Sequence, residues 1–168
     1  MKNLFLIISI LLVCSACQDK QTIQKYYEES PEIELCKKLV EAYNNQDWET
    51  FKSNYCDTAK IWHNSKYLVD PGISPGAFID GVKETSAEME YFRFTDNARW
   101  EMIIDNDDNR WVHFWGNWEG KFIKSESKII NINHIDYLVK DGKIVSEVGY
   151  WDNLPYYLET QKINSLEE

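Results

Sequence analysis

The sequence changes its hydrophobic period once, near Phe92, and this change constrains the fold more than any other feature. Before Phe92, apolar residues recur at the spacing of a helix face. After it, long segments alternate apolar and polar residues, as strands do, and turn sequences separate them. Helices followed by a meander of antiparallel strands predict an α+β architecture, with the helices packed on one face of a sheet.

Three helices are predicted in the N-terminal half. Ser30 is followed by proline and two glutamates, which is typical of an N-cap, and predicts a helix over 31–43. Asp47 caps a short second helix. A second Ser-Pro pair predicts a third helix over 76–91.

Four long strands are predicted in the C-terminal half, paired as 100–104 with 110–122 and 129–139 with 144–151. An acidic turn joins the first pair. Asp141-Gly142 joins the second pair and is the strongest short hairpin signal. A final helix over 154–163 is predicted to follow.

The N-terminal sequence predicts localisation to the cell envelope. An apolar run of about ten residues follows Lys2, which is too short for a membrane span of about 20 residues but suits a signal peptide. It ends in Ser15-Ala16-Cys17, which resembles the lipobox of bacterial lipoproteins and implies lipidation of Cys17 and a lipid anchor to the membrane. A secreted protein or an uncleaved anchor is the alternative. The predicted divisions are a lipoprotein signal peptide (1–16), a tether (17–29), one domain (30–158) and a C-terminal tail (159–168).

Charge and cysteine content limit the partners and the redox chemistry. The 168 residues carry 18 basic and 28 acidic side chains, for a net charge of −10. Nucleic acid is therefore excluded as a partner, because phosphate contact needs a basic surface. Cys36 and Cys56 remain after the signal, and the sequence leaves open whether they pair or are buried as small apolar side chains.

Three segments together resemble the SnoaL-like family of the nuclear transport factor 2-like superfamily. They are the helix and turn LVEAYNNQDWETF (39–51), the strand at 55–64, and the hairpin that begins DGKIV and ends in YWD (141–152). The resemblance implies a cone-shaped curved sheet wrapped around three helices, with an apolar pocket inside.

The same resemblance limits the activities that the chain could carry. The cyclases of this family use an Asp on the last strand for proton transfer, and Asp152 matches that residue. The epoxide hydrolases use a Tyr where this chain has Trp62, and an Arg-x-Asp motif that the central strand lacks, so epoxide hydrolysis is not expected. The isomerase base also has no counterpart near His63. Asp152 has a second interpretation, as the cap of the final helix.

Residues expected to line the ligand pocket lie on three strands: Trp62, His63, Asn64, His113, Trp115 and Tyr150. His113 could equally pack in the core. His134 alternates with the apolar positions of its strand and is expected to face away from the pocket. Because the three histidines lack metal-ligand spacing, no metal and no cofactor are predicted.

The sequence favours an envelope-anchored domain that binds a small apolar or aromatic molecule, with catalysis not established. One alternative is a cyclase or isomerase with Asp152 as general acid–base. The other is a non-catalytic structural or assembly lipoprotein. The strand at 111–118 is apolar on both faces, so its outer face needs a cover, and a homodimer is expected.

Overall fold

The structure, a computed structural model, describes residues 25–165. The expected signal peptide and Cys17 lie outside these residues. No helix in the described range is long and apolar enough to cross a membrane. The elements in chain order are β1 (Tyr26–Tyr27), α2 (Pro31–Asn44), α3 (Trp48–Ser53), β2 (Tyr55–His63), α4 (Pro75–Ser86), β3 (Met89–Phe94), β4 (Arg99–Ile104), β5 (Arg110–Phe122), β6 (Lys128–Lys140), β7 (Lys143–Trp151) and α5 (Leu154–Ser165).

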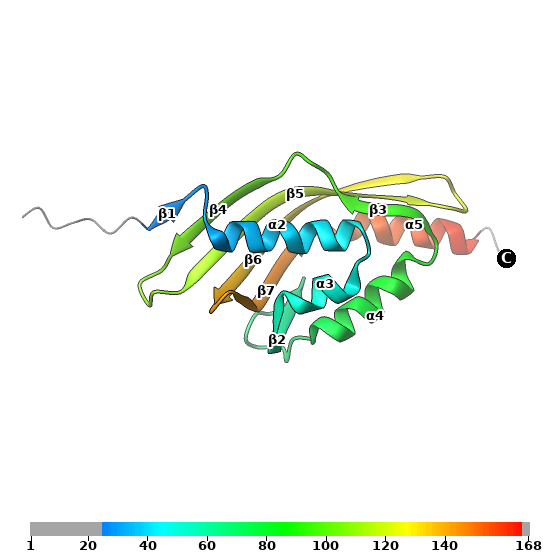
Figure 1. Ribbon diagram of the computed structural model, residues 1–168. Coiled ribbons are helices and arrows are strands. Elements are labelled where there is room, and N and C mark those ends of the chain that lie inside the picture. The colour runs from blue at the N-terminus through cyan, green and yellow to red at the C-terminus, as the bar shows by residue number, and fades with distance from the viewer. Residues whose placement is uncertain (1–24, 166–168) are drawn as a thin grey trace, which may run out of the picture.

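A curved seven-stranded sheet holds the molecule together and carries α2, α3 and α4 on its concave side (Figure 1). The strand order is β1-β4-β5-β6-β7-β2, with β3 paired to the far half of β5. All pairs are antiparallel except β2 with β7, which run parallel. The α+β fold class predicted from the sequence is confirmed.

Strands β3 and β4 act as one interrupted strand along β5. Phe94 pairs with Trp118, and Arg99 resumes the ladder opposite Trp115. The predicted third helix was expected to continue to Tyr91, but α4 ends at Ser86 and β3 begins at Met89. Residues 89–94 form a strand and not the end of the helix because they pair with β5. In that pairing Met89 and Phe92 are buried.

The predicted helix starts are confirmed by their hydrogen bonds. Ser30 Oγ accepts from the Ile33 amide at 3.1 Å, and Asp47 Oδ1 accepts from the Thr50 amide at 3.1 Å. Each satisfies an amide that the first helical turn leaves unpaired. Capping therefore places α2 and α3 where the sequence indicated.

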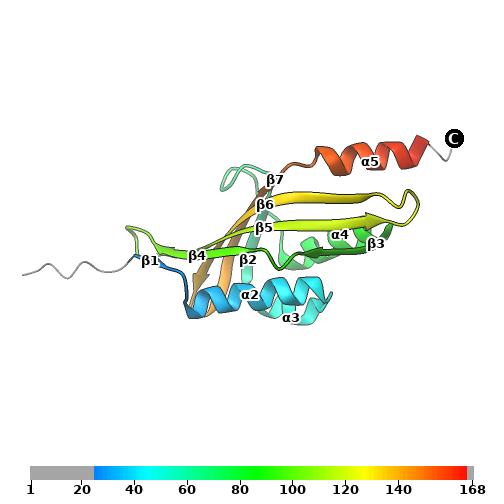
Figure 2. The ribbon, with the colours of Figure 1, turned by 90° about the horizontal axis from the view of Figure 1, so that it is seen from above.

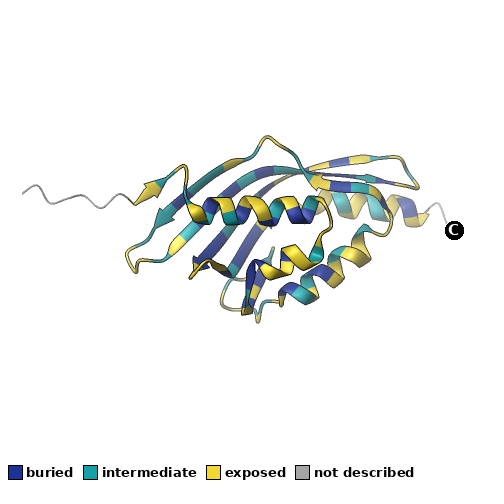
Figure 3. Ribbon diagram, in the orientation of Figure 1, coloured by how far each residue is buried: buried dark blue, intermediate teal, exposed yellow. Residues whose placement is uncertain are grey.

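Helix α2 supplies much of the core from one face. Its buried residues recur every three or four positions: Ile33, Cys36, Leu39, Ala42 and Tyr43. This face packs on β3, β4 and β5, while the opposite face is exposed (Figure 3). Cys36 is buried and Cys56 is partly exposed, and both are free thiols.

Helix α5 takes the place of a strand at one end of the sheet. β7 ends opposite Asn133, and α5 then lies beside the remaining part of β6 (Figure 2). Ile163 is buried, and the helix runs to Ser165, so helical structure continues beyond the domain end expected at residue 158.

Candidate functional site

The concave side of the sheet contains a cavity of about 560 Å³. Its walls come from α2, β2, α4, β3, β5, β6, β7 and α5, and they are largely apolar and aromatic. Representative lining residues are Phe78, Val82, Phe92, Trp118, Ile135 and Tyr156. A concave apolar space of this size suits a small organic molecule.

An acid–base pair of the partly buried His63 and the buried Glu147 lies in this apolar wall. Nε2 of His63 is 2.6 Å from Oε1 of Glu147, and both residues line the cavity. The hydroxyl of Tyr55 donates a hydrogen bond to the other carboxylate oxygen, Oε2. Glu147 is 3% exposed, so its charge is held by these two partners rather than by water.

The Glu147 carboxylate affects the protonation of its neighbours. Burial raises the pKa of Tyr55 and Tyr137 well above the ordinary value, and the negative charge of Glu147 raises both further. Burial and the same carboxylate also raise the pKa of the Cys36 thiol. The two tyrosines and the Cys36 thiol therefore stay protonated, and Tyr55 remains a hydrogen-bond donor at neutral pH.

Two asparagines add polar groups to the same wall. Asn131 and Asn133 alternate along β6, are 7% and 4% exposed, and line the cavity. Nδ2 of Asn133 donates to the Asn131 carbonyl at 3.0 Å. Oδ1 of Asn131 is buried and has no hydrogen-bond partner among the described residues. A buried acceptor without a partner is costly, and a ligand hydroxyl or N–H group would satisfy it.

A β-bulge turns Glu147 toward the cavity. Leu138 pairs with Ser146 and Val139 with Ile144, so Val145 has no partner on β6. One extra residue reverses the alternation of side chains beyond it. Ile144 and Glu147 are consequently both buried.

The residues predicted on β2 have separate positions. His63 lines the cavity. Trp62 is buried, and its Nε1 donates to the Asp70 carbonyl at 2.9 Å. Asn64 Oδ1 accepts from the Trp151 amide at 3.1 Å, so it joins β2 to the end of β7. Neither Trp62 nor Asn64 is among the described residues that line the cavity.

The expected positions of His113, Trp115 and Tyr150 are corrected. Along β5 the buried positions are Val112 and Phe114, which face the helices, so His113 and Trp115 lie on the outer face of the sheet. Tyr150 is 46% exposed beyond the bulge. The alternation along β5 was predicted correctly, but the face that carries the pocket was not, because both faces of this strand are aromatic.

Asp152 lies at the start of α5 with its side chain exposed. Its Oδ1 accepts from the Leu154 amide at 2.8 Å, and it is not among the described residues that line the cavity. The bulge is again the reason: strand parity without it puts Asp152 on the face of Ile144, whereas the bulge gives that face to Glu147 and Trp151.

Sequence analysis missed Glu147, Trp118 and the two asparagines as cavity residues. The segment ININ (130–133) carried a signal, since its asparagines alternate with isoleucines. Ile130 and Ile132 are 57% and 76% exposed, and the asparagines point into the cavity. Polar residues on the face of a strand that points into the core indicate a polar site.

No protein-family model matches the sequence, and no curated protein matches it either. Solved structures do match it. TerC, co-crystallised with polyporic acid, superposes with a TM-score of 0.59 at 17% identity, over 76% of this chain and 96% of TerC. A protein assigned as a SnoaL-like polyketide cyclase from Shewanella denitrificans gives 0.57 at 14% identity, over 82% of this chain and 99% of that one. BvnE pinacolase from Penicillium brevicompactum gives 0.64 at 11% identity, over 82% and 97%.

The chain thus has the fold of SnoaL-like proteins, as the sequence resemblance implied. At these identities the likeness establishes the fold. The chemistry has to be argued from the side chains in the cavity.

Proposed function

We propose that this protein binds a small, largely apolar molecule in its cavity and transfers a proton on that molecule, with His63 and Glu147 as the acid–base pair. The observation that carries the proposal is the 2.6 Å contact between His63 and Glu147 inside an apolar cavity. Proton transfer needs a group that both accepts and releases a proton near neutral pH, and histidine is the side chain best suited to that.

The two residues have different roles in this proposal. His63 uses Nε2 to contact Glu147, so Nδ1 is the nitrogen left for a ligand. When Nδ1 takes a proton from a carbon next to a carbonyl, the ring becomes an imidazolium, and the carboxylate beside it stabilises that charge. The ring then returns the proton to a second atom of the same molecule. The net change is an isomerisation or a ring closure that needs no redox partner.

Two further groups support the site. The Tyr55 hydroxyl holds Glu147 from the side away from His63, so the carboxylate keeps its orientation. Asn131 offers an unpaired acceptor to a ligand hydroxyl. Ligands reported for proteins of this fold, such as the polyporic acid crystallised with TerC, agree with a small-molecule function.

Exchange of carbon-bound hydrogen tests the proposal without a known substrate. We would incubate the protein in D₂O with a panel of small aromatic ketones, together with polyporic acid as a binding probe, and follow the α-protons by NMR. Exchange by the wild type that His63→Gln and Glu147→Gln abolish is the expected result. Asp152→Asn is the matched control, because it removes an exposed carboxylate, and it should leave exchange unchanged.

Two outcomes would overturn the catalytic part. If the His63→Gln variant still exchanges the carbon-bound hydrogens, the proton transfer is carried out by other residues. Binding of the panel without any exchange leaves a binding protein, which was the leading interpretation of the sequence. No binding at all would favour the structural or assembly alternative.

We also propose that the domain is anchored in the envelope through lipidation of Cys17, since a short apolar segment ends in Ser-Ala-Cys. Mass spectrometry of the N-terminus isolated from membranes should find an acylated Cys17. Cys17→Ser should release the protein from the membrane fraction. An N-terminus at Met1, or an unmodified Cys17, would contradict the proposal.

A homodimer through the outer face of the sheet is the third part of the proposal. Ile132 and Tyr150 are exposed apolar side chains on this face, beside the partly buried Trp111 and Trp115. Sedimentation at micromolar concentrations should show a dimer that Ile132→Lys dissociates, because a buried lysine without a partner opposes association. A wild type that sediments as a monomer would contradict it.

A further inference from the structure

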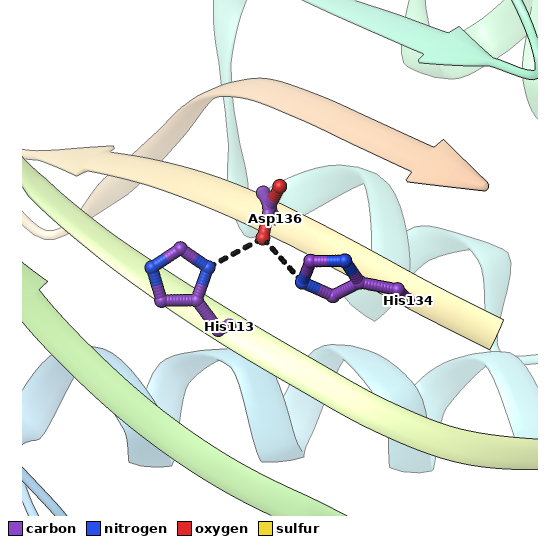
Figure 4. A group of neighbouring side chains, drawn as sticks. All are labelled: His113, His134 and Asp136. Carbon is purple, nitrogen blue, oxygen red and sulfur yellow. Dashed lines mark hydrogen bonds and ion pairs between the residues drawn. The ribbon is translucent and has the colours of Figure 1, made fainter.

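The outer face of the sheet brings together three side chains that the sequence keeps apart: His113 on β5, and His134 and Asp136 on β6 (Figure 4). His113 and Asp136 are direct cross-strand partners in the β5–β6 ladder. His134 lies two residues before Asp136, so both project from the same face. The pairing register therefore creates a cluster that no spacing along the chain suggests.

The donor atoms of the cluster converge on one point. Nδ1 of His113 is 2.5 Å, and Nε2 of His134 is 2.9 Å, from the same carboxylate oxygen of Asp136. One donor atom from each residue lies within 4.8 Å of the other two. Nε2 of His134 is buried from solvent, and despite its short distance to Asp136 it makes no directed hydrogen bond.

We infer that His113, His134 and Asp136 form a binding site for a divalent transition-metal ion, with Zn²⁺ as the representative ion. Two imidazole nitrogens and one carboxylate oxygen are a donor set that zinc uses, at bond lengths of about 2.0–2.2 Å. Donors bound to one tetrahedral ion at these lengths are about 3.3 Å apart, so side-chain shifts on the order of 1 Å complete the site. Three protein donors leave the fourth position of a tetrahedral ion for a water molecule.

The surroundings favour a cation at this place. Glu101 on β4 is the cross-strand partner of His113 on the side opposite Asp136, so the histidine lies between two acidic residues. The guanidinium of Arg99 lies over the Trp115 ring on this face, and it is paired with Glu101 at 3.1 Å, which offsets its charge. The net charge of −10 adds to the attraction.

Packing already orients one of the ligands. The ring of His134 is stacked on Trp115, with centroids 4.8 Å apart and planes 7° from parallel. A ring held in this way loses little freedom on binding a metal, and fixed ligands raise metal affinity. The cluster lies on the face opposite the cavity, so this inference does not depend on the proton-transfer chemistry proposed for His63.

The test uses the three histidines as reporters in the full chain. The protein is labelled with ¹⁵N in its histidine rings and titrated with Zn²⁺ alone. We expect the ring signals of His113 and His134 to shift together, with Nδ1 of His113 and Nε2 of His134 coordinated. The cavity residue His63 is the internal control, and its signals should not move. Because the readout is specific to histidine, zinc bound by cysteines elsewhere in the chain does not interfere.

Two variants confirm the ligand set. Asp136→Asn should weaken Zn²⁺ binding at this site by at least about tenfold, since outer-shell changes alone commonly cost 10- to 100-fold. His134→Gln should abolish the shift of His113, and it serves as the second variant if Asp136→Asn does not fold. Asp152→Asn, an exposed carboxylate at the end of β7, should leave the titration unchanged. If the His113 signals do not move, or if His134 responds alone, the cluster is only a hydrogen-bonded network and the inference is overturned.

Discussion

His63 and Glu147 are 84 residues apart in the sequence, and their side chains meet at 2.6 Å across the parallel pair β2–β7. His63 pairs with Gly149 and Ile61 pairs with Glu147, so the two side chains are diagonal neighbours on the inner face. The pair therefore exists only when β2 has added to the sheet in this register. The ligand chemistry proposed for His63 therefore depends on that tertiary pairing.

Glu147→Gln should lower the pKa of both Tyr55 and Tyr137. Each is raised first by burial and then by the charge of Glu147, and the variant removes the charge but not the burial. Both values should therefore fall but stay above about 10, the ordinary value for tyrosine. NMR of tyrosine labelled with ¹³C at the ring carbon that bears the hydroxyl measures this directly. An unchanged titration of Tyr55 would rule out Glu147 as a cause of its raised pKa.

The free energy of unfolding should decrease above pH 10 because of the buried tyrosines. Burial raises the pKa of Tyr43, Tyr55 and Tyr137, so above pH 10 the unfolded chain releases protons that the folded chain keeps. Their stabilising contribution is complete below pH 10 and is lost as the pH rises toward the folded-state values, at about 1.4 kcal/mol per pH unit for each tyrosine.

Tyr137→Phe tests this in urea unfolding from pH 9 to 11. Removing one ionisable group should reduce the loss of stability between pH 9 and pH 11 by about 1.4 kcal/mol in total, because the full slope applies only above the unfolded-state pKa of about 10, while the apolar ring stays in the core. An identical decline in the variant and the wild type would rule out Tyr137 as a contributor.

Gly149→Ala should disturb the His63–Glu147 pair. A Cβ atom at Gly149 would lie 2.8 Å from Cδ2 of His63 and 3.0 Å from Trp151, so both rings have to move. Overpacking of this kind costs about 1–3 kcal/mol. We expect lower stability in urea and shifted ring signals of His63.

Gly76→Ala is the matched control for this change. In α4 its added Cβ would meet only Ser74 Oγ, at 3.8 Å, and alanine suits a helix better than glycine. Stability should stay the same or rise by up to about 1 kcal/mol. Equal losses in both variants would show that the contact with His63 is not the cause.

Asp152→Asn should be silent, whereas Asp152→Ala should loosen the start of α5. Asparagine can still accept the hydrogen bond from the Leu154 amide, but alanine cannot, and a lost hydrogen bond costs about 0.5–1.5 kcal/mol. Amide hydrogen exchange at Leu154 should accelerate in the alanine variant only. Loss of ligand chemistry in Asp152→Asn would instead support the acid–base role that the sequence suggested.

Local signals in the sequence determined the elements and the fold class. Ser30 and Asp47 placed the helix starts because capping is a contact between residues three apart. Asp141-Gly142 placed the last hairpin because both residues adopt positive φ, which this turn requires. The resemblance to SnoaL-like proteins came from such local segments in their order, and the fold comparison agrees with it.

Only the tertiary structure decided which residues share a site. A single bulge at Val145 exchanged the faces of β7, which brought Glu147 into the cavity and left Asp152 outside. The β5–β6 register joined His113 to Asp136 on the other face. Alternation tells which residues of one strand share a face. Bulges and strand pairing are set by packing between distant segments, and they decide where each face points. The sequence therefore predicted which residues alternate along each strand. It did not predict which residues of different strands meet in one site.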